Sequence, residues 1–154
     1  MRLSVVASLA LLAAAASAAP PLSRQSALKI MHERHEGMEA VGKANKVLRR
    51  EITSETPDIA TIRSSAGAMA NLATRSSKWF PKGTGPEMGK TGAKPEIWQK
   101  PADFNAKMRD FQAASQALQQ AAARGDLAAV KSSYSKLGGT CKACHDPYRS
   151  EMHD

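Results

Sequence analysis

The chain has 154 residues, 42% of them hydrophobic and 23% charged, with a formal net charge of +8. This length supports one compact domain, and the balance of apolar and charged residues excludes a wholly disordered chain and a multispan membrane protein. Aromatic residues make up only 5% of the sequence. Ala, Leu and Met fill most apolar positions, and because they lose little rotamer freedom in a helix, the composition favours an all-α fold.

The amino terminus is typical of an export signal. A basic start is followed by an apolar run over 3–16 and by small residues up to Ala18. Cleavage after Ala18 is favoured over cleavage one residue later, because Pro20 would then directly follow the cut bond. The run is shorter than the about 20 residues that a membrane span needs, and no later segment looks membrane-spanning. We therefore expect a cleaved signal peptide over 1–18, one domain over 19–154, and a periplasmic location.

Two amphipathic helices are predicted in the first half of the domain. Ser23 can cap the first, and Thr56 the second, with Pro57 at its first helical position and Asp58 near its positive end. Apolar residues recur at helical spacing on one face of each. In the first helix these are Leu28, Met31, Met38, Val41 and Leu48, with His35 and Asn45 on the same face, and in the second Ile59, Ile62, Ala66, Met69 and Ala73.

A long loop is predicted from Trp79 to Pro101, where glycines and prolines alternate. Loops of this length are usually functional or cover other elements. A third helix is expected from about Ala102 to Arg124, before the terminating Gly125. Its inward residues are Phe104, Met108, Phe111 and Leu118.

A fourth helix is expected after the capping Asp126. Its inner face contains Leu127, Val130, Tyr134, Leu137, Cys141, Cys144 and Tyr148. Four amphipathic segments of this kind predict an antiparallel four-helix bundle with a long loop between its second and third helices.

Both cysteines of the chain lie in Cys141-Lys142-Ala143-Cys144-His145, the C-x-x-C-H haem attachment pattern. Two thiols three positions apart on a helix project in similar directions, so they can add to the two vinyl groups along one side of a porphyrin. His145 can then offer an imidazole nitrogen to the iron. The pattern predicts one covalently bound haem c.

Three other roles of this pattern fit its context less well. A thioredoxin-like dithiol lies at a helix start after a strand, whereas this pair falls near a helix end. A disulfide closing so small a loop would distort the helix and add little loop entropy. Zinc would need a second ligand pair at matching spacing, which His153, His32 and His35 do not convincingly provide.

The chain resembles the class II c-type cytochromes, the cytochrome c prime family, over nearly all of the mature chain. The resemblance rests on the ending from Cys141 to Arg149, on Arg34, Met38 and Gly42 at steps of four, and on Trp79-Phe80-Pro81 and Pro95-Glu96-Ile97-Trp98. It implies a four-helix bundle with the haem attached near the carboxyl terminus. Members of this family include monomers and homodimers.

The resemblance implies that Met38 faces the distal side of the haem. Members with Leu or Phe at this position are five-coordinate and admit only small gases, whereas those with Met are six-coordinate and low-spin. A thioether is a soft donor, and a Met/His pair raises the reduction potential. A core-filling role for Met38 and ligation by His35, one turn away, are the alternatives. For His35, a position at the surface or behind a ligand is favoured over ligation.

Three further residues are predicted to border the haem. Arg34 could pair with a propionate, because a guanidinium matches a carboxylate with two hydrogen bonds, or could be a solvated basic residue. Arg149, by the resemblance, borders the proximal pocket, with a surface position as its alternative. Gly42 lets the haem approach the helix backbone. Packing around the haem or under the loop, rather than electron relay, is expected of Trp79, Trp98 and Tyr148.

The functional prediction is a periplasmic electron carrier, not an enzyme, whose haem iron is six-coordinate with His145 and Met38. The alternative is a five-coordinate cytochrome c prime that binds NO or CO at an open distal site. A haem peroxidase is disfavoured because no distal acid–base pair is evident.

Positive charge concentrates between Ser76 and Arg109, a segment with seven basic residues and only three acidic ones. This segment is predicted to steer an acidic redox partner protein, with a merely soluble basic surface as the equal alternative. Nucleic-acid binding is disfavoured because the chain is exported and shows no recognition motif.

Overall fold

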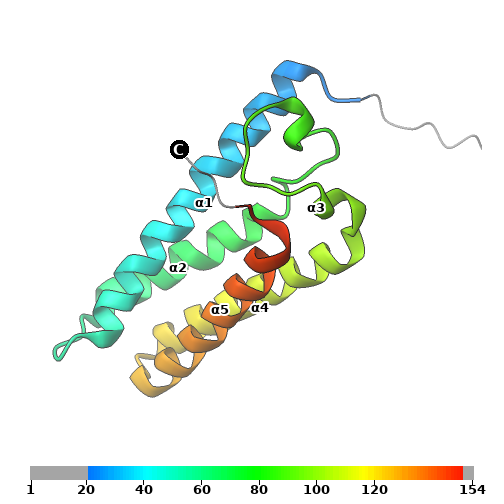
Figure 1. Ribbon diagram of the computed structural model, residues 1–154. Helices are drawn as coiled ribbons and strands as arrows, with labels where there is room; N and C mark the ends of the chain where they lie inside the picture. Colours follow the sequence, from blue (N-terminus) through cyan, green and yellow to red (C-terminus); the bar gives the residue numbers. More distant parts are fainter. Residues whose placement is uncertain (1–20, 151–154) are drawn as a thin grey trace, which may run out of the picture.

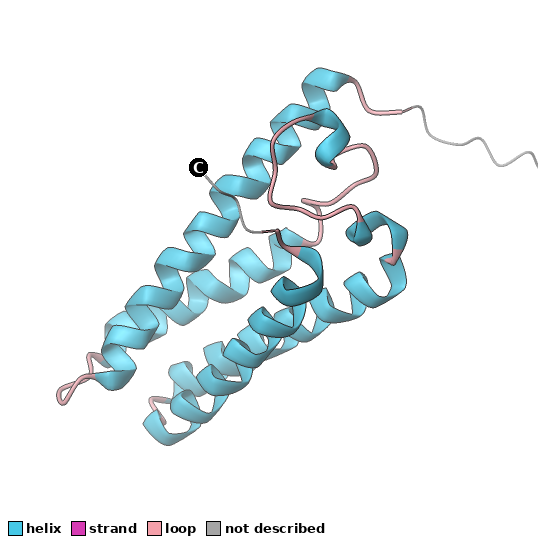
Figure 2. Cartoon of the chain, viewed as in Figure 1, coloured by secondary structure: helices cyan, strands magenta, loops and turns pink. Residues whose placement is uncertain are grey.

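A computed structural model describes residues 21–150, so the predicted signal peptide lies outside the described residues. Within that range the chain forms four long helices (Figures 1 and 2). They are α1 (Arg24–Thr53), α2 (Ile59–Ser76), α4 (Pro101–Arg124) and α5 (Leu127–Tyr148). The described part of the chain contains no β-strand beyond one isolated bridge between Ala93 and Arg149. The predicted all-α four-helix bundle is therefore confirmed.

Three predicted helix boundaries are confirmed by their capping contacts. The Ser23 hydroxyl accepts a hydrogen bond from the Ser26 amide at 3.1 Å, and the Asp126 carboxylate accepts one from the Ala129 amide at 2.9 Å. Gly125 ends α4 at φ +71°, in the left-handed region that suits glycine.

The predicted start of the second helix is wrong by two residues. Asp58, not Thr56, is the cap, and Ile59 is the first helical residue. The Asp58 carboxylate accepts hydrogen bonds from the Ala60 amide at 2.9 Å and the Thr61 hydroxyl at 2.6 Å. Because this carboxylate satisfies a free backbone amide of the first turn, the helix begins after Asp58, and Thr56 and Pro57 remain outside it.

The loop between α2 and α4 is more ordered than its glycines and prolines suggest. It contains a short 3₁₀ turn, η1 (Pro86–Met88), and a one-turn helix, α3 (Glu96–Gln99). Pro95 precedes α3 with a φ of −56°, and the Lys100 amide donates to the Glu96 carbonyl at 2.8 Å. The loop therefore folds as a compact cap at one end of the bundle (Figure 1).

The helices do not pack evenly around the bundle. α4 packs along α5, α1 along α2 and α2 along α4, whereas α1 and α5 meet over only a short stretch. The main core contains Leu48, Ile62, Met69, Leu118 and Leu137, each no more than 1% exposed. One side of the bundle, between α1 and α5, is thus left with little helix-to-helix contact.

The predicted inner face of α1 is partly wrong. Met31 and Leu48 are buried, but Leu28 is 40% exposed, and His35 and Asn45 are exposed as well. These three residues turn away from the α1–α2 interface, and α5 does not cover this flank of α1. No helix of the described part of the chain is long and apolar enough to cross a membrane.

Candidate functional site

The two cysteines lie in the last two turns of α5, where both are partly buried free thiols. Cys141 packs against the main core cluster, and Cys144 packs against a second cluster of Ile97, Phe104, Met108 and Tyr148. Both thiols therefore lie on the inner side of α5. This placement fits attachment of one flat group along a single side of the helix.

The electrostatics of these thiols do not fit a redox-active pair. Burial raises the pKa of the Cys141 thiol and the pKa of the Cys144 thiol. A redox-active Cys-x-x-Cys pair instead has a lowered thiol pKa, usually at the start of a helix. The geometry and the electrostatics of α5 thus disagree with a thioredoxin-like function.

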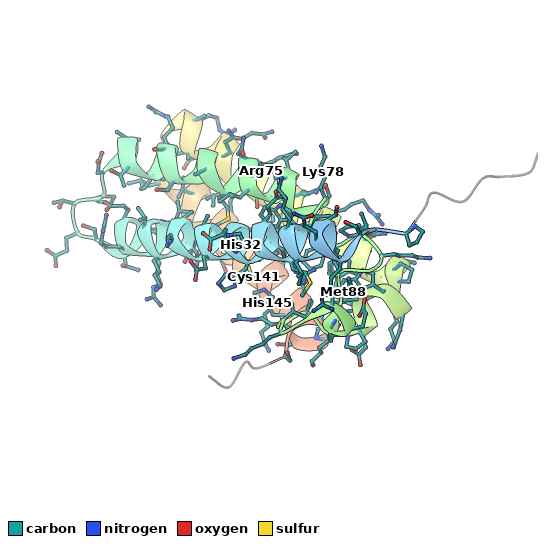
Figure 3. The ribbon with its side chains drawn as sticks, turned by 90° about the horizontal axis from the view of Figure 1, so that it is seen from above. His32, Arg75, Lys78, Met88, Cys141 and His145 are labelled. Atoms are coloured by element: carbon teal, nitrogen blue, oxygen red, sulfur yellow. The ribbon has the colours of Figure 1, made fainter. Side chains whose placement is uncertain are left out.

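His145 follows the second cysteine and is exposed on α5. Partial desolvation against the bundle lowers the pKa of its imidazole, and the charge of Arg149 lowers this pKa further. The neutral imidazole is the form that coordinates a metal. In the view of Figure 3, Cys141 and His145 appear beside α1, and Met88 of η1 lies further toward the amino-terminal end of that helix.

The opposite wall of this region is formed by α1. Met38 and Gly42, one turn apart, are both partly buried. A Cβ atom placed on Gly42 would meet nothing within 4 Å. This open space beside the partly buried Gly42, together with the short α1–α5 contact, fits a planar cofactor between the two helices.

Arg34 is buried and forms hydrogen bonds with the loop. Only 5% of the residue is exposed, so the solvated alternative is wrong. Its guanidinium donates hydrogen bonds to the Trp79 carbonyl at 3.3 Å, the Thr84 hydroxyl at 3.3 Å, the Thr84 carbonyl at 3.0 Å and the Thr91 hydroxyl at 3.0 Å. Both terminal nitrogens thus bind the loop, and pairing with a haem propionate stays a prediction.

Two aromatic rings complete the surroundings of Arg34. The guanidinium carbon lies 5.1 Å from the centroid of the Phe80 ring and 5.9 Å from that of Trp98. Burial lowers the pKa of Arg34, and the charge of Glu87 partly offsets this effect. An arginine remains charged even so, and the loop is therefore folded around a buried cation that α1 provides.

The close contact between α1 and Trp79 could not be read from helical periodicity. A Cβ atom on Gly37 would overlap the indole ring of Trp79. Trp79 is 4% exposed, so its ring is enclosed between α1 and the loop. The only sequence signal of this contact was a glycine in the interior of α1, because such a glycine often marks a place where another segment packs closely against the helix.

Tyr148 and Trp98 pack under the loop, as predicted. The Tyr148 hydroxyl donates a hydrogen bond to the Asp103 carboxylate, and burial with this contact raises the pKa of Tyr148 to about 12. The Trp98 indole donates to the carbonyls of Phe80 at 3.2 Å and Pro81 at 3.0 Å. Both side chains have their polar atoms paired, so packing accounts for their positions.

Two predicted residues lie at the surface. Arg149 follows the last turn of α5 and is exposed. His35 is also exposed, and its Nε2 lies 3.4 Å from the Glu39 carboxylate on the same helix. The structure thus places the His35 side chain in solvent, beside the Glu39 carboxylate.

Comparison with known proteins gives a family match over most of the chain. The family model described as Cytochrome C' matches residues 29–149. The chain is 34% identical to cytochrome c' of Pararhodospirillum photometricum over 126 residues, which covers 82% of this chain and 92% of the relative. It is 34% identical to cytochrome c-554 of Cereibacter sphaeroides over 112 residues, which covers 72% of this chain and 82% of the relative.

Solved structures show the same relationship. The fold is similar to cytochrome c' from Thermochromatium tepidum, with a TM-score of 0.75, 30% identity, and coverage of 85% of this chain and all of that one. A nitric oxide complex of a mutant cytochrome c prime from Alcaligenes xylosoxidans gives a TM-score of 0.72 at 28% identity, covering 83% of this chain and 97% of the other.

Proposed function

Because the chain belongs to the cytochrome c' family of class II c-type cytochromes and carries one covalently attached haem c, we propose that it binds nitric oxide or carbon monoxide in the periplasm. The bound haem supplies a one-electron iron couple and a metal position that a diatomic gas can occupy. Members of this family are haem-binding electron carriers, so gas binding is proposed in addition to electron transfer.

The residues of α5 would hold the haem. Cys141 and Cys144 would form the two thioethers, and the neutral His145 imidazole would be the proximal ligand. Haem retention then does not depend on a closed pocket, because the tether keeps the imidazole beside the iron. Such a tether is compatible with an exposed His145.

The observation that carries gas binding is the loose α1–α5 side of the bundle. The helices meet there over a short stretch, and Gly42 leaves space where a side chain would stand. The solved relatives support the same function, since one of them is described as a nitric oxide complex. These comparisons favour an open distal site over the six-coordinate Met/His prediction.

Ligation by Met38 is the second candidate. The partly buried position of Met38 on α1, one turn from Gly42, favours it. A thioether at this point would compete with an incoming gas for the iron. The two candidates therefore differ in what loss of the Met38 sulfur does. It leaves an open site unchanged, but it removes a ligand if Met38 binds the iron.

Optical and electron paramagnetic resonance spectra with added CO distinguish the two. With an open distal site, the ferric protein is high-spin, the ferrous protein binds CO rapidly at neutral pH, and Met38→Leu changes neither property. Met31→Leu, which alters a buried methionine of the same helix, is the matched control. A low-spin spectrum with a sulfur-to-iron charge-transfer band that only Met38→Leu abolishes would reject the open site in favour of ligation.

The surface charge supports an acidic redox partner. Lys107 of the 76–109 segment lies 3.8 Å from Asp103. Within residues 21–150, the other basic side chains of the segment form no ion pair: Lys78, Lys82, Lys90, Lys94, Lys100 and Arg109. Their charge is thus available to attract an anionic surface.

The family relation also supports a homodimer. A solved cytochrome c' with a TM-score of 0.75 and 27% identity is described as showing ligand-controlled dimer dissociation. Sedimentation of the holoprotein with and without CO tests this assembly. A single monomeric species at all concentrations would reject the homodimer. That the protein is not an enzyme stays a separate prediction.

A further inference from the structure

A cavity lies on another side of the bundle, away from the gap between α1 and α5. It has a volume of about 340 Å³ and opens between the end of α2, the loop and the first half of α4. Phe80, Trp98, Phe104 and Met108 form its apolar wall. This size falls within the range of pockets that bind small molecules, about 300 to 1,000 Å³.

The cavity and the cysteines are on opposite sides of α4. Asp103 accepts a hydrogen bond from Tyr148 of α5, and the charge of Lys107 acts on the Cys144 thiol. Asn105 and Arg109 line the cavity instead. Residues two apart on a helix are separated by about 200° around its axis, so Phe104 and Met108 stand between the cavity and α5.

The walls of this cavity are held in place by hydrogen bonds and ring contacts. The Trp98 indole is anchored to the Phe80 and Pro81 carbonyls. The rings of Phe80 and Phe104 meet edge to face, with centroids 4.9 Å apart. Gln112 donates to the Ala73 carbonyl of α2 at 3.2 Å. The cavity is therefore formed before any ligand arrives, which lowers the entropic cost of binding.

The charge around the cavity selects the kind of ligand. Lys82 and Arg109 line it, no acidic residue does, and among residues 21–150 neither cation forms an ion pair. The buried Arg34 cation lies against the rings of Phe80 and Trp98. The charge of Glu87 acts on Arg34, and the Glu87 carboxylate already accepts a hydrogen bond from the Gly85 amide.

We propose that this cavity binds a small aromatic carboxylate. The ring packs among Phe80, Trp98 and Phe104, because these side chains form a concave, preformed apolar surface. The carboxylate pairs with Arg109, whose guanidinium can donate two parallel hydrogen bonds, and with the flexible Lys82 ammonium. This site is independent of whether Met38 or a gas occupies the haem iron.

Titration of the holoprotein with 4-fluorobenzoate tests the proposal, with binding followed by calorimetry and by fluorine NMR. We expect saturable binding at one site. The double variant Lys82→Gln/Arg109→Gln should weaken it about tenfold or more, because both charged partners are lost. Lys90→Gln/Arg124→Gln removes the same charge from exposed positions outside the cavity, and should leave the affinity within about twofold.

Neutral 4-fluorobenzamide should bind the wild-type protein about tenfold more weakly than the carboxylate. Equal weakening in the two double variants would mean general charge attraction and would overturn the proposal. Binding that survives in Lys82→Gln/Arg109→Gln and shifts the haem absorption band would place the ligand at the iron, and would also overturn it. The first result leaves the gas-binding function untouched, whereas the second would itself show an accessible iron position.

Discussion

The indole ring of Trp79 packs against the backbone of α1 at Gly37, one residue before Met38. This contact joins the loop to the turn of α1 that carries the candidate distal residue. A side chain at position 37 would push the ring away, and the ring is enclosed. The contact therefore couples the stability of the loop to the position of α1.

We expect Gly37→Ala to destabilise the protein. An alanine gains about 1 kcal/mol of helix propensity over glycine, but overpacking against an enclosed ring costs about 1 to 3 kcal/mol. The net change should be a loss of free energy of unfolding, measured by urea denaturation. Gly67→Ala in α2 is the control, since its Cβ would meet only Gln119 Nε2 at 3.8 Å, and it should gain about 0.5 to 1 kcal/mol. A stabilised Gly37→Ala would contradict the packing.

Arg34→Lys should loosen the loop. One ammonium cannot replace a guanidinium that binds Trp79, Thr84 and Thr91 together, and unpaired buried acceptors cost about 1 to 3 kcal/mol each. We expect a lower free energy of unfolding and faster tryptic cleavage after the exposed loop residues Lys82 and Lys90.

The exposed Arg24 provides the matched control, because Arg24→Lys should change stability by less than about 0.5 kcal/mol. The propionate prediction for Arg34 gives a different pattern. In that case Arg34→Lys would shift the haem reduction potential and leave the loop cleavage rate unchanged.

The two cysteines should contribute separately to covalent attachment. We expect Cys141→Ala and Cys144→Ala each to keep haem through one thioether, and the double variant to keep none after denaturation. Intact-protein mass spectrometry under denaturing conditions measures this. Covalent haem in the double variant, or the bare polypeptide mass for the wild-type protein from cells that mature c-type haem, would contradict the attachment.

Tyr148 should make stability decrease in alkaline solution. Its pKa rises from the ordinary 10.0 to about 12 because burial and the Asp103 carboxylate oppose phenolate formation. A group whose pKa is higher in the folded state stabilises fully below the unfolded value, and this contribution is lost as the pH rises through the folded value. The urea midpoint should therefore fall between about pH 10 and 12.

Tyr148→Phe should remove this part of the alkaline decrease at the cost of some stability at neutral pH. Tyr134→Phe is the matched control, because Tyr134 is also a tyrosine of α5 but lacks a carboxylate partner among the causes that raise its pKa. An identical alkaline decrease in wild type and Tyr148→Phe would contradict the assignment.

Electron transfer with an anionic reagent should depend on salt. We expect reaction of the ferrous protein with ferricyanide to slow as ionic strength rises, because ions screen charges beyond about 10 Å at 0.1 M. The triple variant Lys78→Gln/Lys90→Gln/Lys100→Gln should show a smaller slope, and a cationic oxidant such as hexaammineruthenium the opposite slope. Rates that do not change with ionic strength would reject steering by the 76–109 segment.

Features that depend on neighbouring residues were predictable from the chain alone. Ser23, Gly125 and Asp126 cap or end their helices through contacts within three residues. Helical periodicity identified the large buried apolar residues of α2 and α4, but it missed small buried residues such as Ala70, Ser115 and Ala121. The haem attachment pattern is likewise contained within five consecutive residues. The start of α2 was misplaced because Thr56 and Asp58 are both good caps, and only the hydrogen bonds of Asp58 distinguish them.

Features that join distant segments were decided by the tertiary structure. Arg34 reaches acceptors 45 to 57 residues away, and the Gly37–Trp79 contact and the cavity beside α4 likewise unite separate elements. Periodicity also could not tell which flank of α1 a neighbouring helix would leave uncovered, so Leu28 and Asn45 were misassigned. A local pattern specifies which face of a helix is apolar, but burial depends on the arrival of a partner from elsewhere in the chain.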